Sequence, residues 1–164
     1  MRLYYEKLRE VATPSRSYTS AAGWDFYIPT NFTLYPFAKL RKQYREEQNW
    51  EHKVVSPQRS LFIPSGLRIE LPKGTALRFD NKSGIAVKGL IVGASIVDQD
   101  YQGEIHLHLW NVSQDDISVK AGMKILQGIF FQTQDIEFHE STRLFSQASA
   151  RGANGFGSTD KVNK

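Results

Sequence analysis

The stretch Arg151–Thr159 combines residue types that bind phosphate with one that stacks on a flat ring. Its sequence, Arg-Gly-Ala-Asn-Gly-Phe-Gly-Ser-Thr, is too rich in glycine to build a helix or a strand. The backbone N–H groups and hydroxyls of such a stretch can wrap an anion, and the Arg151 guanidinium can bind phosphate with two donors. The Phe156 ring is buried only if it stacks on something flat. These properties predict an arm that closes over a nucleotide, and a polar tail without a role is the alternative.

Four further segments place an acid, an aromatic ring, small residues or an amide at a turn or at the start of a strand. Each is weak evidence alone, because an acid in a turn usually caps that turn and a tyrosine usually belongs to the core. A polar turn that leads into a short helix is a natural site for phosphate oxygens. The four segments are Ala21–Phe26 with Asp25, Asn81–Ala86, the hairpin-like Gly93–Glu104 with Asp98 and Tyr101, and Gly122–Gln127.

Alternating and short apolar runs between turn residues predict the elements that position these groups. Apolar and polar residues alternate over 60–72 and 104–110, which is typical of half-buried strands. The run 123–131 is almost continuously apolar, so we expect a strand buried on both sides. Residues 36–58 contain many charged helix formers, and we expect an inserted loop or a solvated helix on the β scaffold. Regular turn signals between the strands favour an all-β barrel or jelly roll with one or two short helices.

Composition limits the remaining function classes. The chain has 164 residues, of which 40% are hydrophobic and 23% charged, as expected for one globular domain. It has no cysteine, which excludes thiolate chemistry, cysteine-ligated zinc and disulfides. The start lacks the apolar run of a signal peptide, and the apolar stretch 89–97 is too short to span a membrane, so we expect a cytoplasmic protein. A net charge of +4 suits a phosphate-binding enzyme as well as a nucleic-acid-binding barrel, and we expect no nucleic-acid partner.

Taken together and in this order, the five segments resemble the five motifs of the homotrimeric dUTP pyrophosphatases (dUTPases), over about residues 20–160. The resemblance implies a distorted β-barrel domain over 1–148, with a flexible arm over 149–164. It implies hydrolysis of dUTP to dUMP and pyrophosphate, with Mg²⁺ assisting the attack of water on the α-phosphorus. This reaction keeps uracil out of DNA and supplies dUMP for dTTP synthesis. It also implies a homotrimer whose three active sites are shared between subunits.

The resemblance further assigns roles to individual residues. Asp98 matches the carboxylate that orients and deprotonates the attacking water, and Asp25 matches an acid that reaches Mg²⁺ through bound water. Tyr101 matches the tyrosine that packs under the deoxyribose and leaves no room for a 2′-hydroxyl. The base would lie against the backbone of Gly93, Ala94 and Ser95, with Phe156 covering it. The phosphate-binding positions are Lys82, Ser83, Gly84, Gln127, Arg151, Gly157, Ser158 and Thr159.

Some features depart from the family pattern or leave alternatives open. Lys82 and Lys124 stand where arginine is usual, so the charge is kept but the two-pronged geometry is lost. The 36–58 insert is the largest departure and is either a solvated excursion or a docking surface for a protein partner. A regulatory dUTP-binding protein that uses this insert is therefore the alternative function, and dCTP deaminase is a second rival. His106 and His108 form a His-x-His pair that is either two half-exposed strand residues or a metal site on a threefold axis.

Overall fold

The computed structural model describes residues 2–34 and 60–142, together with 147, 149 and 152. The chain divides into two units, Met1–Gln134 and Asp135–Lys164. All helices and strands of the described residues belong to the first unit. The 36–58 insert lies outside the described residues, and so do Arg151, Phe156, Gly157, Ser158 and Thr159 of the predicted arm. The domain boundaries drawn from the sequence, 1–148 and 149–164, stay a prediction.

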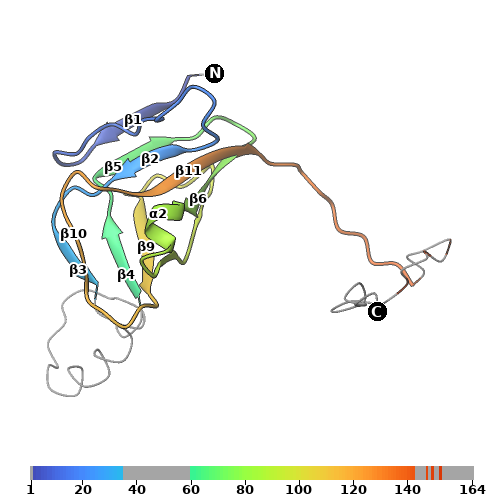
Figure 1. Ribbon diagram of the computed structural model, residues 1–164. Coiled ribbons are helices and arrows are strands. Elements are labelled where there is room, and N and C mark those ends of the chain that lie inside the picture. Colours follow the sequence, from blue (N-terminus) through green and yellow to red (C-terminus); the bar gives the residue numbers. More distant parts are fainter. Residues whose placement is uncertain (1, 35–59, 143–146, 148, 150–151, 153–164) are drawn as a thin grey trace, which may run out of the picture. The chain divides into compact units, whose positions relative to one another are not determined.

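Antiparallel strands build the first unit (Figure 1). The largest sheet has the order β2 (Trp24–Tyr27), β11 (Lys124–Gln132), β6 (Thr75–Asn81) and β8 (Ile96–Val97). A second sheet has the order β4 (Ser60–Pro64), β9 (His106–Asn111) and β7 (Leu90–Val92). Two pairs complete the unit, β1 (Tyr4–Lys7) with β5 (Leu67–Glu70), and β3 (Phe32–Leu34) with β10 (Ile117–Val119). Helix α2 (Ser83–Ala86) follows β6 and is the one helix among the described residues.

The all-β class predicted from the sequence is confirmed. The four sheets are separate, so the described part of the chain is a distorted sandwich of short sheets and no closed barrel. The polar turn at Asn81–Lys82 leads into the short helix α2, as its composition predicted. Within the described ranges, the structure contains no helix that is both long and apolar enough to cross a membrane.

The core is formed by the apolar members of the alternating strands. In β9, Leu107 and Leu109 have no exposed surface, and Ile105 just before the strand is 1% exposed. The Phe26 ring meets the Phe79 ring edge to face, with a centroid separation of 4.8 Å, which joins β2 to β6 across β11. The apolar positions read from 104–110 therefore lie against the core as expected, but His108 on the other face of β9 is buried as well.

Strand β11 departs from the expectation of burial on both sides. Ile125 and Leu126 are buried, but Phe131 and Gln132 are exposed. The reason is pairing: β2 covers β11 only as far as Gly128, whereas β6 pairs with it to its last residue. The second half of β11 is thus an edge, which an apolar run alone does not reveal.

The segment between β7 and β9 is also organised differently from the simple hairpin that the sequence suggested. Strand β7 pairs with β9, and the Gly93 N–H continues this pairing by donating to the His108 carbonyl at 2.9 Å. The chain then moves to the other sheet, where β8 pairs with β6. It returns to β9 only after the turn at Asp98–Tyr101. The segment Gly93–Val97 therefore connects two sheets.

Candidate active site

A cavity of about 290 Å³ opens beside the turn that follows β8. Four predicted site residues line it, namely Ala94, Ser95, Asp98 and Tyr101. The remaining lining residues are Phe62, Phe79, Ile96, Val97, Ile105 and His106. A mainly apolar wall with one carboxylate, one phenol and nearby backbone polar groups suits a flat ring joined to a reactive group.

The turn that carries Asp98 is held at two points. The Tyr101 N–H donates to the Asp98 carbonyl at 3.2 Å, which closes the turn. The Gly74 N–H donates to the Gln99 side-chain oxygen at 2.7 Å, which ties the turn to the loop before β6. The Asp98 side chain is exposed at the cavity. A carboxylate on an anchored turn and open to solvent can accept a proton from a bound water.

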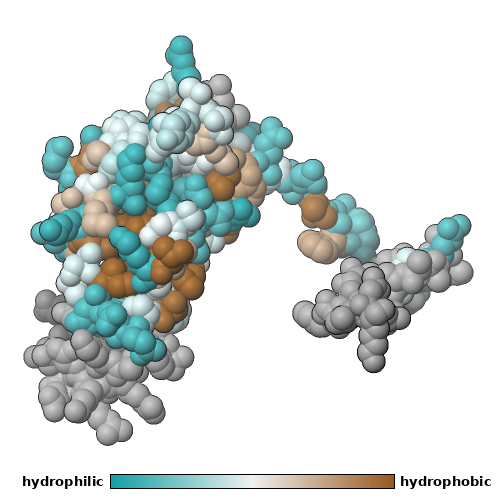
Figure 2. Space-filling view, in the orientation of Figure 1, coloured by the Kyte–Doolittle hydropathy of each residue, from teal (hydrophilic) through white to brown (hydrophobic). Residues whose placement is uncertain are grey.

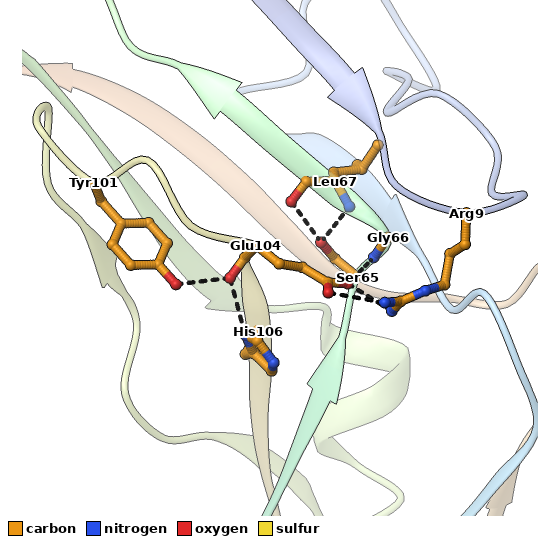
Figure 3. A network of polar contacts seen from close by, with 7 residues as sticks. All are labelled: Arg9, Ser65, Gly66, Leu67, Tyr101, Glu104 and His106. Atoms are coloured by element: carbon orange, nitrogen blue, oxygen red, sulfur yellow. Dashed lines mark hydrogen bonds and ion pairs between the residues drawn. The ribbon is translucent and has the colours of Figure 1, made fainter.

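Tyr101 is fixed by a polar network that the sequence did not reveal (Figure 3). Its hydroxyl donates to the Glu104 carbonyl at 2.8 Å, and His106 Nδ1 contacts the same oxygen at 2.9 Å. The Glu104 carboxylate in turn accepts hydrogen bonds from both terminal nitrogens of the Arg9 guanidinium, at 2.6 and 2.9 Å, and from the Gly66 N–H at 2.8 Å. Glu104 thus links the tyrosine to the segment after β1, and Tyr101 keeps 45% of its surface exposed for a ligand.

The predicted base-binding backbone is held by neighbours on both sides. The Ala94 N–H donates to His108 Nδ1 at 2.6 Å, and the Phe79 N–H donates to the Ser95 carbonyl at 2.8 Å. A Cβ on Gly93 would lie 2.3 Å from His108 Nδ1 and 2.5 Å from Trp110 Nε1. The sequence suggested that small residues here allow a ligand to approach. The structure gives Gly93 a second reason, because the backbone passes directly over these two rings.

A second polar centre lies where β2, β11 and the start of α2 meet. The Asp25 carboxylate is almost fully buried and accepts from the Ser17 hydroxyl at 3.1 Å. It also forms ion pairs with Lys82 and, at 3.1 Å, with Lys124. Three segments that the sequence analysis selected therefore converge on one carboxylate, and the two lysines that replace the usual arginines both bind it.

The two lysines decide the ionisation of Asp25. Burial raises its pKa, but the hydrogen bonds and charge of Lys82 and Lys124, with the Ser17 hydroxyl, outweigh burial and lower the pKa below the ordinary value of 3.8. In return, the hydrogen bond to Asp25 raises the pKa of Lys124 above its ordinary value. The centre therefore holds one carboxylate anion between two ammonium groups at neutral pH.

The other predicted phosphate-binding residues surround this centre. Gln127 on β11 is the register partner of Asp25, and its side-chain amide donates to the Asn81 carbonyl at 3.1 Å. Ser83 and Gly84 are exposed in the first turn of α2, directly after Lys82. A Cβ on Gly84 would meet no heavy atom within 4 Å, so this position is open to a ligand.

The donor set of the described residues does not form a protein cage for a metal ion. They contain no group of three or more His, Asp, Glu or Cys side chains that could hold one. In particular, His106 and His108 form no such group; His106 is exposed but His108 is buried, so the expectation of two half-exposed histidines was wrong for His108. The centres offer single carboxylates instead, which fit an Mg²⁺ held mainly by phosphate oxygens and water.

The comparisons with known proteins agree with this geometry. The dUTPase family model matches residues 50–160, which is more than half of the chain. The chain belongs to the dUTPase family. Among curated dUTPases, the deoxyuridine 5′-triphosphate nucleotidohydrolase of Candida glabrata is 32% identical over 90% of this chain and 88% of that protein. The enzyme of the same name from Brucella melitensis is 35% identical over 65% of this chain and 68% of that protein.

Solved dUTPase structures share the fold. A mutant dUTPase of Staphylococcus bacteriophage 80alpha with dUpNHpp aligns with a TM-score of 0.75 and 17% identity, over 96% of this chain and 98% of that one. A mutant dUTPase of the S. aureus phage phi11, described with a structural Mg(II) ion, aligns with a TM-score of 0.68 and 16% identity. That alignment covers 87% of this chain and 98% of the phi11 chain. At these identities the likeness establishes the architecture.

Proposed function

We propose that this chain hydrolyses dUTP to dUMP and pyrophosphate. The observation that carries the proposal is the cavity in which the exposed Asp98 carboxylate, the Tyr101 ring and the backbone at Ala94 and Ser95 meet, in a chain of the dUTPase family. The backbone suits the polar edge of a base, the ring suits a sugar, and the carboxylate suits a water that attacks a phosphate.

Asp98 acts as the general base. Its carboxylate accepts a proton from water while the water oxygen bonds to the α-phosphorus, and the bond from that phosphorus to the pyrophosphate oxygen breaks. The anchored turn supports this role, because the Gln99 and Tyr101 contacts fix the carboxylate relative to the cavity. Tyr101 packs under the deoxyribose, and its hydroxyl is already engaged by Glu104, so the ring presents its face to the sugar.

Lys82, Ser83, Gly84 and Gln127 bind the phosphate chain. Lys82 is paired with Asp25 in the free protein, so binding of phosphate exchanges one anion for another at this ammonium group. Arg151, Gly157, Ser158 and Thr159 of the arm close over the outer phosphates, and Phe156 covers the base, in the roles that the sequence assigns to them.

Mg²⁺ is the cofactor of this reaction, and Asp25 would hold it through bound water. The described residues bring no three His, Cys, Asp or Glu side chains together at one point, which suits an ion carried in by the triphosphate. When bound, the ion neutralises phosphate charge and makes the phosphorus more susceptible to attack. The structural Mg(II) ion reported for the phi11 enzyme is consistent with this requirement.

The active form is a homotrimer with shared sites. Exposed apolar side chains on the first unit support such an assembly, and Figure 2 shows several of them among a mostly polar surface. The exposed large apolar side chains of the described residues include Tyr4, Tyr18, Ile96 and Val112. Mass determination in solution, with a value three times that of the 18.7 kDa chain expected, tests this assembly. The cytoplasmic location stays a prediction, as does a partner for the 36–58 insert.

Pyrophosphate release tests the activity. The chain and Asp98→Asn are assayed with Mg²⁺ on dUTP, with dTTP, UTP and dCTP as competing substrates. We expect release from dUTP alone and a loss of at least about a hundredfold in the variant, which removes the base without changing side-chain size. Ammonia release from dCTP would assign the chain to deamination instead, and absence of turnover on every nucleotide would refute an enzymatic role.

A further inference from the structure

His108 is a buried imidazole in contact with the predicted base-binding backbone. It lies on β9 with 8% of its surface exposed. Its ring stacks on the Phe62 ring from β4, with centroids 3.9 Å apart and planes 6° from parallel. Trp110, two residues further on β9, lies at a centroid distance of 5.7 Å. The imidazole is therefore fixed between aromatic neighbours on the side of the sheet where the chain leaves for β8.

Two hydrogen bonds join His108 to the residues that the proposed function assigns to the base. The Gly93 N–H donates to the His108 carbonyl at 2.9 Å, and the Ala94 N–H donates to Nδ1 at 2.6 Å. The second bond is the more sensitive, because it depends on a side chain that can be protonated. The packing distance of Gly93 over the same ring leaves the backbone no room to move toward β9.

The hydrogen bond from Ala94 determines the state of the imidazole. Because Nδ1 accepts this bond, the ring is neutral and its proton resides on Nε2. Nε2 is buried and makes no hydrogen bond within the described residues. A second proton on Nδ1 would face the Ala94 N–H, so it would replace an acceptor with a second donor and would gain no partner at Nε2.

The surroundings of His108 also disfavour its charged form. Burial lowers the pKa of His108 below its ordinary value of 6.5. The flanking strands β4 and β7 and the segment Gly93–Val97 carry no titratable side chain. The described titratable groups of the adjoining cavity are His106 on β9 itself, Asp98 and Tyr101. Asp98 is the one acidic side chain among them, and it is exposed to solvent, where its influence on His108 is screened.

We propose that His108 is a positioning residue of the base-recognition segment. Its neutral imidazole accepts the Ala94 N–H and thereby holds Gly93–Ser95 in the conformation that binds the base. Protonation of Nδ1 removes this acceptor, the segment leaves β9, and affinity for the deoxyuridine nucleotide falls. The proposal rests on the proposed function, since it assigns a task within the same site.

The experiment compares an acceptor that titrates with one that does not. In His108→Asn, the side-chain oxygen can take the place of Nδ1 and accept from Ala94 at every pH. In His108→Leu, the apolar bulk remains but the acceptor is lost. The matched control is His139→Asn, which removes an exposed imidazole that does not line the cavity and that pairs with Glu137. Calorimetry measures the Kd of a non-hydrolysable dUTP analogue from about pH 8 to about pH 4.5.

The ratio of Kd values between proteins is the readout, because ionisation of the nucleotide phosphate affects each protein equally and cancels. For the wild type relative to His108→Asn, we expect the Kd ratio to increase roughly tenfold from high to low pH, equivalent to about 1.4 kcal/mol. His139→Asn should follow the wild type. His108→Leu should bind roughly tenfold more weakly at about pH 8, with kcat at saturating dUTP changed less than about threefold.

Four outcomes separate the inferences. A wild-type Kd that rises at low pH relative to the Kd of His108→Asn supports the positioning role. A ratio that stays flat overturns the pH dependence, and a His108→Leu variant that binds as tightly as the wild type at about pH 8 overturns the positioning role, provided that the wild type hydrolyses dUTP at that pH. Absence of that hydrolysis overturns the proposed function and the positioning role with it. If His108→Leu does not fold, as judged by its near-ultraviolet circular dichroism, the asparagine comparison decides.

Discussion

Gly103 controls where the Tyr101 ring can lie, so Gly103→Ala should alter the discrimination between dUTP and UTP. A Cβ at this position would lie 2.5 Å from the Tyr101 hydroxyl oxygen, 2.7 Å from Cζ and 3.1 Å from Cε2. Real Cβ contacts need at least about 3.4 Å, so the ring must move by roughly 1 Å. The backbone at Gly103 does not require positive φ, so the added methyl group acts through this collision.

The magnitude follows from the network in Figure 3. A shift of this size breaks the 2.8 Å hydrogen bond from the Tyr101 hydroxyl to the Glu104 carbonyl, which contributes about 1 kcal/mol and thus a factor of about five. Misplacement of the ring beneath the sugar adds to this loss, because a group displaced by 1 Å from its working position can cost up to about a hundredfold in rate. We expect kcat/KM for dUTP to fall between about tenfold and a hundredfold in Gly103→Ala.

Tyr101→Phe provides the matched control, since it removes the hydroxyl and keeps the ring. We expect a loss of about fivefold in kcat/KM for dUTP in this variant, with the preference over UTP retained. In Gly103→Ala the preference over UTP should fall, and the free energy of unfolding should fall by about 1 kcal/mol, the contribution of the lost hydrogen bond. Steady-state kinetics on dUTP and UTP measure both variants. An unchanged dUTP-to-UTP ratio in Gly103→Ala would refute the argument that Tyr101 reads the sugar from this position.

Three further predictions concern stability and anchoring. The pKa of Asp25 is lower in the folded state than its ordinary value of 3.8. Its contribution to the free energy of unfolding is therefore complete above that pH and is lost as the pH falls through the folded-state pKa. In denaturation curves, the stability advantage of the wild type over Asp25→Asn should shrink below about pH 3.8. Arg9→Met leaves the Glu104 carboxylate with only the Gly66 N–H of its three described donors. It should therefore lower the free energy of unfolding by about 1 kcal/mol, measured by urea titration, and raise KM for dUTP, measured by steady-state kinetics. Leu107→Ala should cost about 2–5 kcal/mol by urea titration, because it opens a cavity at a fully buried position, and a loss below about 1 kcal/mol would contradict the placement of β9 in the core.

Local patterns in the sequence were sufficient to predict several strands, the short helix and the two residues that meet at the cavity. Alternation marked β9, and the polar turn before Ser83 marked α2. Asp98 and Tyr101 were chosen as an acid and an aromatic in one turn, and the structure brings both to one cavity. These features depend on residues close together in the chain, so the alternation of a strand or the composition of a turn is enough to predict them.

Contacts between distant segments could not be predicted in this way. The ion pair of Lys82 with Asp25 joins residues 57 positions apart, and the contact of Arg9 with Glu104 joins residues 95 positions apart. The burial of His108 likewise depends on Ala94 and on the ring of Phe62, neither of which belongs to its own strand. Pairing between strands sets these contacts, and pairing is a property of the whole fold.

The attachment of the segment Gly93–Val97 to two sheets limits where the chain can accept insertions and deletions. The Ala94 N–H is bound to β9, and the carbonyl of the very next residue, Ser95, is bound to β6. Consecutive residues therefore belong to different sheets, with no spare residue between them. Adding or deleting one residue here would shift β8 by one position on β6 and turn Ile96 and Val97 to opposite faces. Variation in length within homologous chains should therefore avoid this segment and accumulate in connections whose ends are not tied to two sheets at once.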